Sequence, residues 1–361
     1  MTILASLVLF IHGCANEVQD ASGEDASATD IEKQDIASLQ SDVVSPADIQ
    51  DTSSSVEDIN EVLTQPADID VPLDAELQEL PSLPAVPRLD DFAASIAEEL
   101  GLPGISILAF TKDEIIARGV AGVRKFGEDE PITDADRWHL GSCTKAMTAT
   151  IVARLVEQGK LSFEATMADL FFTAKIQAAY KDVTVAQLLR HEGGTYSSLS
   201  QQAKELWSAL WAAGAVDVVK TRREFAEAVL AAPPQHKAGT YHYSNAGYII
   251  VGSIIESITG KSWETVIGEE VFAPLAMTCG FGAPATPGTI DAPWGHQTKG
   301  DGVVTAIDPG SPGSDNPPAF GPAGTVHCDV DSWMNYLRGH LGGGPENYLQ
   351  ARELPETTKK A

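Results

Sequence analysis

The sequence predicts an α+β fold in which one helical region is inserted between parts of an antiparallel sheet. Three observations favour this fold. An amphipathic helix pattern at 90–100 is followed by two strand-like runs, 105–110 and 115–120. Helical spacing of apolar residues then dominates from 146 to 258. A last amphipathic helix, which carries Trp333, follows a long irregular stretch.

The N-terminus has the features of a lipoprotein signal. Residues 1–13 form an apolar run that is too short to span a bilayer and has the length of a signal-peptide core. The I-H-G-C run at 11–14 resembles the lipobox of bacterial lipoproteins, in which the signal is cut before a cysteine that is then lipidated. We therefore expect Cys14 to anchor the protein to a membrane of the bacterial cell envelope, facing the periplasm or the surface. A plain cleaved signal or a frayed N-terminus is the alternative.

Residues 14–85 are predicted to be an acidic disordered tether. Positions 17–85 hold eighteen acidic residues against the single Lys33, so they carry 17 of the chain's 27 formal negative charges. Low hydrophobicity with charge of one sign cannot offset the entropy of ordering a chain, and self-repulsion keeps such a segment extended. A calcium-binding or acidic interaction segment is the alternative, although the residue order of a calcium loop is missing.

Residues 86–361 have the composition of one globular domain. Their remaining charge is about −10 and they contain no basic or aromatic stripe, which argues against a nucleic-acid partner. None of the three cysteines in this range has a C-x-x-C or histidine partner at ligand spacing, so we expect neither a metal nor a cofactor. An oxidising compartment would allow a disulfide between Cys279 and Cys328.

Capping residues and chain breakers set the bounds of the helices. The expected N-caps are Asp90 or Asp91, Asp182 or Thr184, and Asp329 or Asp331. Gly101 and Gly260 are expected to end two helices, the second of which spans 248–258. The stretch 283–324 is rich in glycine, proline, aspartate and serine, which predicts a long surface excursion.

The S-C-T-K run at 142–145 carries the strongest chemical signal. It lies at the start of the predicted helix 146–158, and residues three apart share a helix face, so Lys145 can reach Ser142. The helix N-terminus also favours developing negative charge. A hydroxyl nucleophile beside an amine therefore indicates acyl transfer through a serine ester.

A second element, the Y-S-N run at 243–245, also precedes a predicted helix. An ammonium group nearby favours the phenolate form of a tyrosine, so Tyr243 can act as the general base on Ser142. The Asn245 amide can hold a substrate carbonyl and fix Lys145. The predicted site therefore has Ser142, Lys145 and Tyr243 as catalytic residues and Asn245 as a substrate-binding residue.

With these motifs the chain resembles, over about residues 88–361, the serine β-lactamase and D-alanyl-D-alanine carboxypeptidase superfamily. The resemblance is to its class C β-lactamase-related branch, which includes esterases. The run W-H-L-G-S-C-T-K at 138–145 is similar to that family's F-x-x-G-S-x-T-K. Further similar runs lie at 155–161, 188–194, 243–248, 274–277 and 321–324. The run at 188–194 departs from the family pattern at Glu192 and Gly193.

The resemblance implies a β-lactamase/transpeptidase-like fold and an acyl-enzyme mechanism. Ser142, deprotonated by Tyr243 beside Lys145, would attack a β-lactam, a D-Ala-D-Ala peptide of peptidoglycan or an ester. Backbone N–H groups of Ser142 and of an edge strand would hold the oxyanion. This mechanism needs no histidine, so we interpret His191 as a structural residue of the site's rim, and Cys143 as a packing residue.

The family's third motif, K-T-G or H-x-G on an edge strand, has no convincing match. The H-L-G run at 340–342 is expected to end a helix because glycines follow it. We therefore expect the closing strands and C-terminal helix to be missing, the domain at 86–361 to be partial, and catalysis to be impaired. The main alternative is a non-catalytic surface lipoprotein that binds peptidoglycan peptides or penicillin.

Overall fold

The computed structural model describes residues 6–11, 86–171, 173–196, 201–298, 302–346 and 348–349. The predicted tether and the predicted lipidation site, Cys14, lie outside the described residues. Within the described ranges, no helix is both long and apolar enough to cross a membrane.

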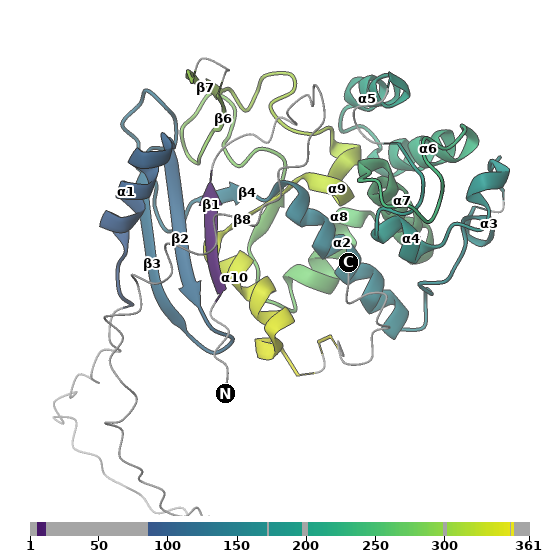
Figure 1. The fold of residues 1–361 in the computed structure, drawn as a ribbon, viewed down its shortest axis with the longest axis horizontal. Coiled ribbons are helices and arrows are strands. Elements are labelled where there is room, and N and C mark those ends of the chain that lie inside the picture. Colours follow the sequence, from purple (N-terminus) through teal and green to yellow (C-terminus); the bar gives the residue numbers. More distant parts are fainter. Residues whose placement is uncertain are drawn as a thin grey trace, which may run out of the picture. The chain divides into compact units, whose positions relative to one another are not determined.

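A three-stranded antiparallel sheet, in the order β1–β2–β3, forms one part of the fold (Figure 1). The predicted hairpin is confirmed as β2 (Gly104–Phe110) paired with β3 (Ile115–Gly122). β1 (Ser6–Ile11) pairs with the other edge of β2 and comes from the segment in which the sequence predicts a signal peptide. Whether closing strands of the family are missing stays a prediction.

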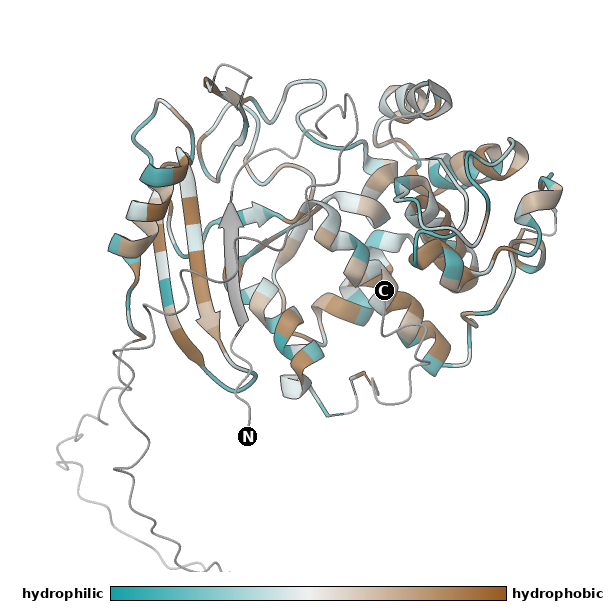
Figure 2. Cartoon of the chain, in the orientation of Figure 1, coloured by the Kyte–Doolittle hydropathy of each residue, from teal (hydrophilic) through white to brown (hydrophobic). Residues whose placement is uncertain are grey.

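β2 is buried on both of its faces. Ile105 and Ile107 pack against α1 (Asp90–Leu100), whereas Leu108 and Phe110 contribute to a cluster with residues of α10 (Val330–Arg338). Alternate residues of a strand point to opposite faces, so a continuous apolar run is what a strand covered on both sides requires. α1 itself is amphipathic, with teal and brown residues alternating along its turns (Figure 2).

The largest core cluster lies in the helical region and surrounds α2 (Thr144–Glu157) and α7 (Asn245–Thr259). Both helices were expected from their apolar patterns, and α7 ends at Gly260, in the left-handed conformation, as predicted. The helices that pack around them include α4 (Val185–Leu189), α6 (Val218–Ala231) and α8 (Trp263–Ile267). The other helical elements are η2 (Gly141–Cys143), α3 (Met167–Leu170), η3 (Ala178–Tyr180), α5 (Gln201–Ala213), η4 (Gly268–Phe272), η5 (Pro318–Phe320), α9 (Gly321–Gly324) and η6 (Gly339–Gly343).

Two of the three capping predictions are confirmed. Thr184 caps α4 with a capping box, and Asp329 caps α10. The prediction of an aspartate cap on α1 is wrong, because the helix begins at Asp90 and no side chain bonds at its N-cap. The Asp90 carboxylate instead accepts the N–H of Val120 on β3, at 2.9 Å, and pairs with Arg88. The Asp90 side chain therefore binds the neighbouring strand and does not cap α1.

A second antiparallel sheet, in the order β4–β8–β5, leads to the start of η2. Its strands are β4 (Arg137–His139), β5 (Cys279–Phe281) and β8 (Val326–Asp329). A disulfide joins the register partners Cys279 and Cys328, so the bridge that the sequence allowed is formed. The stretch 283–324 also contains a hairpin that the sequence did not indicate, β6 (Gly295–Thr298) and β7 (Val304–Ile307).

The H-L-G run at 340–342 does end a helix, as predicted. α10 continues into η6, in which Gly342 has a positive φ of 82°. That conformation favours glycine, because residues with a side chain are strained at a positive φ. The run therefore belongs to a helix terminus.

Candidate active site

Ser142 lies in a single helical turn between β4 and α2. The preceding residue, Gly141, has a φ of 51°, a left-handed conformation that favours glycine. β8 holds this turn from the other side: the N–H of Leu140 donates to the Val326 carbonyl at 2.8 Å, and the Val326 N–H donates to the Thr144 hydroxyl at 3.2 Å. The turn leaves the Ser142 side chain exposed.

The three residues predicted to be catalytic meet at the Ser142 hydroxyl. Tyr243 Oη donates a hydrogen bond to Ser142 Oγ at 2.7 Å, and Lys145 Nζ donates to the same oxygen at 3.2 Å. Lys145 Nζ also lies 4.8 Å from the centroid of the Tyr243 ring. A hydroxyl nucleophile, a phenol and a cation are therefore within direct reach of one another, although Tyr243 is 101 residues from Ser142.

Lys145 is only 5 % exposed, so its ammonium group depends on partners within the protein. In addition to Ser142, Nζ donates to the Ala323 carbonyl oxygen at 2.6 Å. The faces of Tyr243 and Tyr248 lie 4.8 and 5.6 Å away and add favourable contacts of a cation with an aromatic ring. These contacts hold a positive charge beside the nucleophile.

Ala323 belongs to α9, and α9 packs closely against the two central helices. The Thr148 hydroxyl of α2 donates to the Pro322 carbonyl at 2.8 Å. Gly252 of α7 permits the approach, because a Cβ at that position would overlap the Pro322 ring. Sequence reasoning did not identify Ala323, since a backbone carbonyl leaves no residue-type signal.

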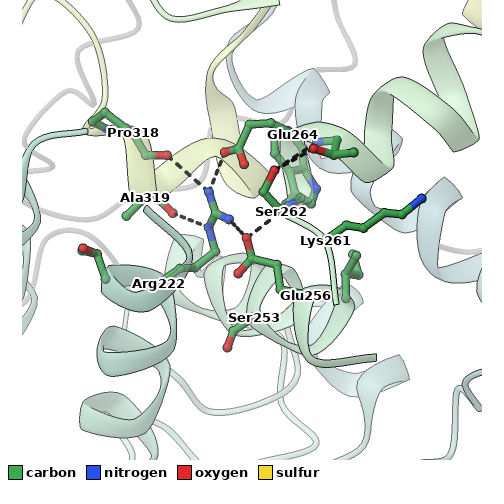
Figure 3. Close-up of polar contacts among 12 residues, drawn as sticks. Arg222, Ser253, Glu256, Lys261, Ser262, Glu264, Pro318 and Ala319 are labelled. Atoms are coloured by element: carbon green, nitrogen blue, oxygen red, sulfur yellow. Dashed lines mark hydrogen bonds and ion pairs between the residues drawn. The ribbon is translucent and has the colours of Figure 1, made fainter. Parts of the chain in front are cut away.

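A buried charge cluster anchors the segment that precedes α9 (Figure 3). The fully buried Arg222 guanidinium pairs with Glu256 and donates to Glu264 at 2.7 Å and to the Ala319 carbonyl at 3.0 Å. Burial raises the pKa of Glu256 to about 7, against the opposing effect of Arg222. The cluster joins α6, α7, α8 and η5 at a single guanidinium group.

His191 lies behind Tyr243 at the rim of the site. Its Nδ1 accepts the N–H of Ser244 at 3.1 Å, and its ring centroid is 4.4 Å from that of Tyr243. Burial and the charge of Lys145 lower the pKa of His191 to about 4. A neutral imidazole is the form that can accept at Nδ1, so His191 fixes the backbone next to Tyr243.

Asn245 is the first residue of α7 and is half-buried. It follows Ser244, whose hydroxyl caps α7 by accepting the N–H of Gly247 at 3.1 Å. The cap thus places Tyr243 and Asn245 on either side of one fixed residue. The role of Asn245 toward substrate stays a prediction.

Cys143 is free and exposed, so the packing role expected from the sequence is wrong. The helical turn that directs Thr144 and Lys145 inward directs Cys143 outward. Desolvation by neighbouring atoms nevertheless raises the pKa of its thiol.

In the part of the chain that the structure describes, no group of three or more histidine, cysteine, aspartate or glutamate side chains could hold a metal ion.

Comparison with known proteins gives the context for this geometry. Residues 89–361 match the family model described as Beta-lactamase. Penicillin-binding protein 4 of Amycolatopsis lactamdurans is 26 % identical over 253 residues, which cover 69 % of this chain and 62 % of that protein. A putative D-alanyl-D-alanine carboxypeptidase of Escherichia coli (strain K12) is 25 % identical over 210 residues, covering 54 % and 46 %. The chain thus spans between about half and three fifths of these relatives' lengths.

Solved structures show the same fold. The octameric penicillin-binding protein homologue from Pyrococcus abyssi superposes with a TM-score of 0.56 at 24 % identity, covering 75 % of this chain and 58 % of that one. A D-stereospecific amidohydrolase from Streptomyces sp. gives a TM-score of 0.54 at 21 % identity, covering 73 % and 76 %. The expected β-lactamase/transpeptidase-like fold is therefore confirmed.

Proposed function

This chain belongs to the beta-lactamase family, and from that premise we propose that it is a serine hydrolase that acts through an acyl-enzyme formed on Ser142. The observation that carries the proposal is the pair of hydrogen bonds at Ser142 Oγ, from Tyr243 at 2.7 Å and from Lys145 at 3.2 Å. A nucleophile in hydrogen-bond contact with a phenol, which accepts a proton once it is ionised, and with a cation has the arrangement that covalent catalysis requires.

In the proposed mechanism, Tyr243 in its phenolate form takes the proton of Ser142 as Oγ attacks a carbonyl carbon of the substrate. The Lys145 ammonium stabilises the negative charge on the phenolate before transfer, and the Ser142 N–H stabilises the oxyanion that forms. The intermediate then collapses, and the leaving group receives the proton from Tyr243. In the second half-reaction Tyr243 takes a proton from water as the water oxygen attacks the ester carbonyl carbon. The bond between that carbon and Oγ then breaks, the carboxylic acid leaves, and Tyr243 returns the proton to Ser142 Oγ.

We propose that the substrates are acyl compounds of three kinds: D-Ala-D-Ala peptides, β-lactams or esters. The names of the relatives support the first two kinds, since they include a penicillin-binding protein and a putative D-alanyl-D-alanine carboxypeptidase. The exposed position of Ser142 also leaves the nucleophile open to a peptide as well as to a small molecule.

The test compares the wild type with Ser142→Ala on p-nitrophenyl acetate, nitrocefin and a fluorescent penicillin. We propose that catalysis is impaired, so we expect a weak burst of p-nitrophenol in the wild type that the variant lacks. A rapid burst would overturn the proposed impairment. Steady ester turnover without penicillin labelling would assign esterase activity, whereas nitrocefin turnover would assign β-lactamase activity. A penicillin label that remains for hours with no turnover would favour the non-catalytic penicillin-binding alternative. Equal signals from wild type and variant would overturn the proposal.

We also propose that Cys14 anchors the protein by a lipid at the cell envelope, based on the I-H-G-C run at 11–14. Cleavage before Cys14 would remove β1 (Ser6–Ile11), so the two uses of the N-terminal segment exclude each other. In a bacterial host fed an alkyne fatty acid, the wild type should take up label and Cys14→Ser should not. A mature protein that retains Ser6–Ile11 by N-terminal mass would overturn this proposal.

A further inference from the structure

His139 links the turn that carries the nucleophile to an acidic side chain outside the site described above. The N–H of Gly141 donates to His139 Nδ1 at 3.1 Å. On the other side of the ring, His139 Nε2 lies 3.0 Å from Asp315 Oδ1. His139 is the last residue of β4, and Asp315 lies in the segment between β7 and η5.

This geometry selects one form of the imidazole. Because Nδ1 accepts a hydrogen bond, the proton of the neutral ring belongs on Nε2. The Asp315 carboxylate lies 3.0 Å from Nε2 and favours a proton there, although the two groups are not aligned for a hydrogen bond. A carboxylate on the far nitrogen is a general means of fixing both the tautomer and the orientation of a histidine ring. Arg137 on β4 and His327 on β8, the register partner of His139, are the other titratable groups near this pair.

The Gly141 N–H that His139 accepts lies at the start of a helical segment. The first N–H groups of a helix have no partner within the helix, and Gly141 is the first residue of η2, which runs directly into α2. His139 supplies the missing acceptor. The held N–H belongs to the Leu140–Gly141 peptide, which directly precedes the Gly141–Ser142 peptide, so His139 fixes the entry to the turn that presents the Ser142 N–H used toward the oxyanion.

Asp315 is itself connected to the segment that holds Lys145. Its side chain is 12 % exposed, and Oδ1 accepts the N–H of Asn316 at 2.6 Å. The Asn316 side-chain amide then donates to the Gly324 carbonyl at 2.8 Å. Gly324 follows Ala323, the acceptor of the Lys145 ammonium, so the nucleophile turn and the lysine anchor share one connected support.

We propose that His139 and Asp315 are positioning residues of this hydrolase, which hold the Leu140–Gly141 peptide and thereby the turn that presents the Ser142 N–H for oxyanion stabilisation. The inference rests on the proposed acyl-enzyme function. It assigns Asp315 a role that acts through His139, and neither residue touches substrate.

Replacing His139 by either of the two amide residues separates the roles of its ring nitrogens. His139→Asn places an acceptor oxygen near the position of Nδ1, whereas His139→Gln places its amide near Nε2 and leaves the Gly141 N–H without an acceptor. Losing a donor from an oxyanion hole costs about 10²- to 10³-fold, so a misaligned one should lower the acylation rate by about 10- to 100-fold in His139→Gln. His139→Asn should stay within about threefold of the wild type, because the acceptor is kept.

The acylation rate is measured as the p-nitrophenol burst, together with KM and thermal unfolding. We expect the rate to fall in His139→Gln with KM unchanged and Tm within about 3 °C of the wild type. Asp315→Ala should also slow acylation, but it should add little in the His139→Gln background, because the two residues act as a unit. Equal rates in His139→Gln and His139→Asn, or additive effects of the two sites, would overturn the proposal.

Hydrogen exchange of the peptide that covers 140–143 gives a readout independent of activity. Its amides should exchange faster in His139→Gln than in the wild type, whereas those of His139→Asn should remain protected. If the wild type lacks a burst but amide exchange is faster only in His139→Gln, the acyl-enzyme function is refuted. The hydrogen bond from the Gly141 N–H to His139 is then still established. A normal burst with identical exchange in both variants would refute the positioning role alone.

Discussion

The ammonium nitrogen of Lys145 donates to the carbonyl oxygen of Ala323 at 2.6 Å, although the two residues are 178 positions apart in the chain. The same nitrogen donates to Ser142, so the charge beside the nucleophile is fixed by α9, a segment with no catalytic side chain. α9 in turn follows the carbonyl groups that Arg222 holds. Loss of that support should displace Lys145 as well as destabilise the fold.

Replacing Tyr243 by phenylalanine removes the hydroxyl that contacts Ser142 at 2.7 Å. We expect the acylation rate to fall by about 10²- to 10⁴-fold, the usual contribution of a general acid–base group, while the aromatic contacts of the ring are kept. The p-nitrophenol burst measures the rate. Tyr241→Phe is the matched control, because Tyr241 is 65 % exposed and should leave the burst unchanged. Similar rates in the two variants would rule out Tyr243 as the base.

Replacing Arg222 by methionine leaves the Glu256 carboxyl buried without its cation. Breaking one side of a buried ion pair typically costs about 3–5 kcal/mol, so the midpoint of urea unfolding should fall sharply. Arg223→Met is the control, since its pair with Glu227 is partly exposed and should contribute less than about 1 kcal/mol. Unfolding of the two variants at the same urea concentration would show that the buried pair contributes no more than the exposed one.

Reduction of the disulfide between Cys279 and Cys328 should destabilise the domain. The bridge closes a loop with a sequence separation of 49, and loop-closure entropy assigns about 4 kcal/mol to a loop of this length. β8 also holds the nucleophile turn through Val326, so the burst should weaken when the bridge opens. Thermal unfolding with and without reductant measures the effect. A Cys143→Ser variant should show the same fall in Tm on adding reductant as the wild type, because Cys143 is free.

His191 makes stability depend on pH. Its pKa is about 4 in the folded protein, below the ordinary 6.5, because burial and Lys145 disfavour the charged ring. Between these values the unfolded chain binds a proton that the folded protein does not. The stabilisation is therefore complete above about pH 6.5 and is lost as pH falls toward 4. Tm should fall across this window.

His191→Asn is the matched variant for this pH dependence. Asparagine tolerates the φ of 60° at this position, and its side-chain oxygen can accept the Ser244 N–H in place of Nδ1. We expect its Tm to change less between pH 6.5 and 4 than that of the wild type. Parallel losses in the two proteins would show that another group is responsible.

Local patterns predicted the parts of the fold that local forces determine. The β2–β3 hairpin, the central helices α2 and α7, and the reach of Lys145 to Ser142 follow from apolar spacing and helix geometry. Tyr243 could be paired with them because a Y-x-N run beside a helix start is rare.

Long-range contacts account for what the sequence did not indicate. β4, β5 and β8 have only three or four residues each, too few to show an alternation of apolar and polar residues. These strands are fixed by pairing with segments that are distant in the chain. The Ala323 carbonyl and the Arg222 cluster depend on helices that meet only in three dimensions. The same holds for Asp315, whose contact with His139 crosses a long loop.

The most direct test of the central claim is the site of covalent modification by a fluorophosphonate probe. Trypsin should release Ser142 in the peptide 138–145, which also contains Cys143, and fragmentation of that peptide separates the two positions. We predict one probe per chain on Ser142, slower labelling in Tyr243→Phe, and none in Ser142→Ala. A wild type that stays unlabelled, or carries the probe on Cys143 or elsewhere, would contradict it.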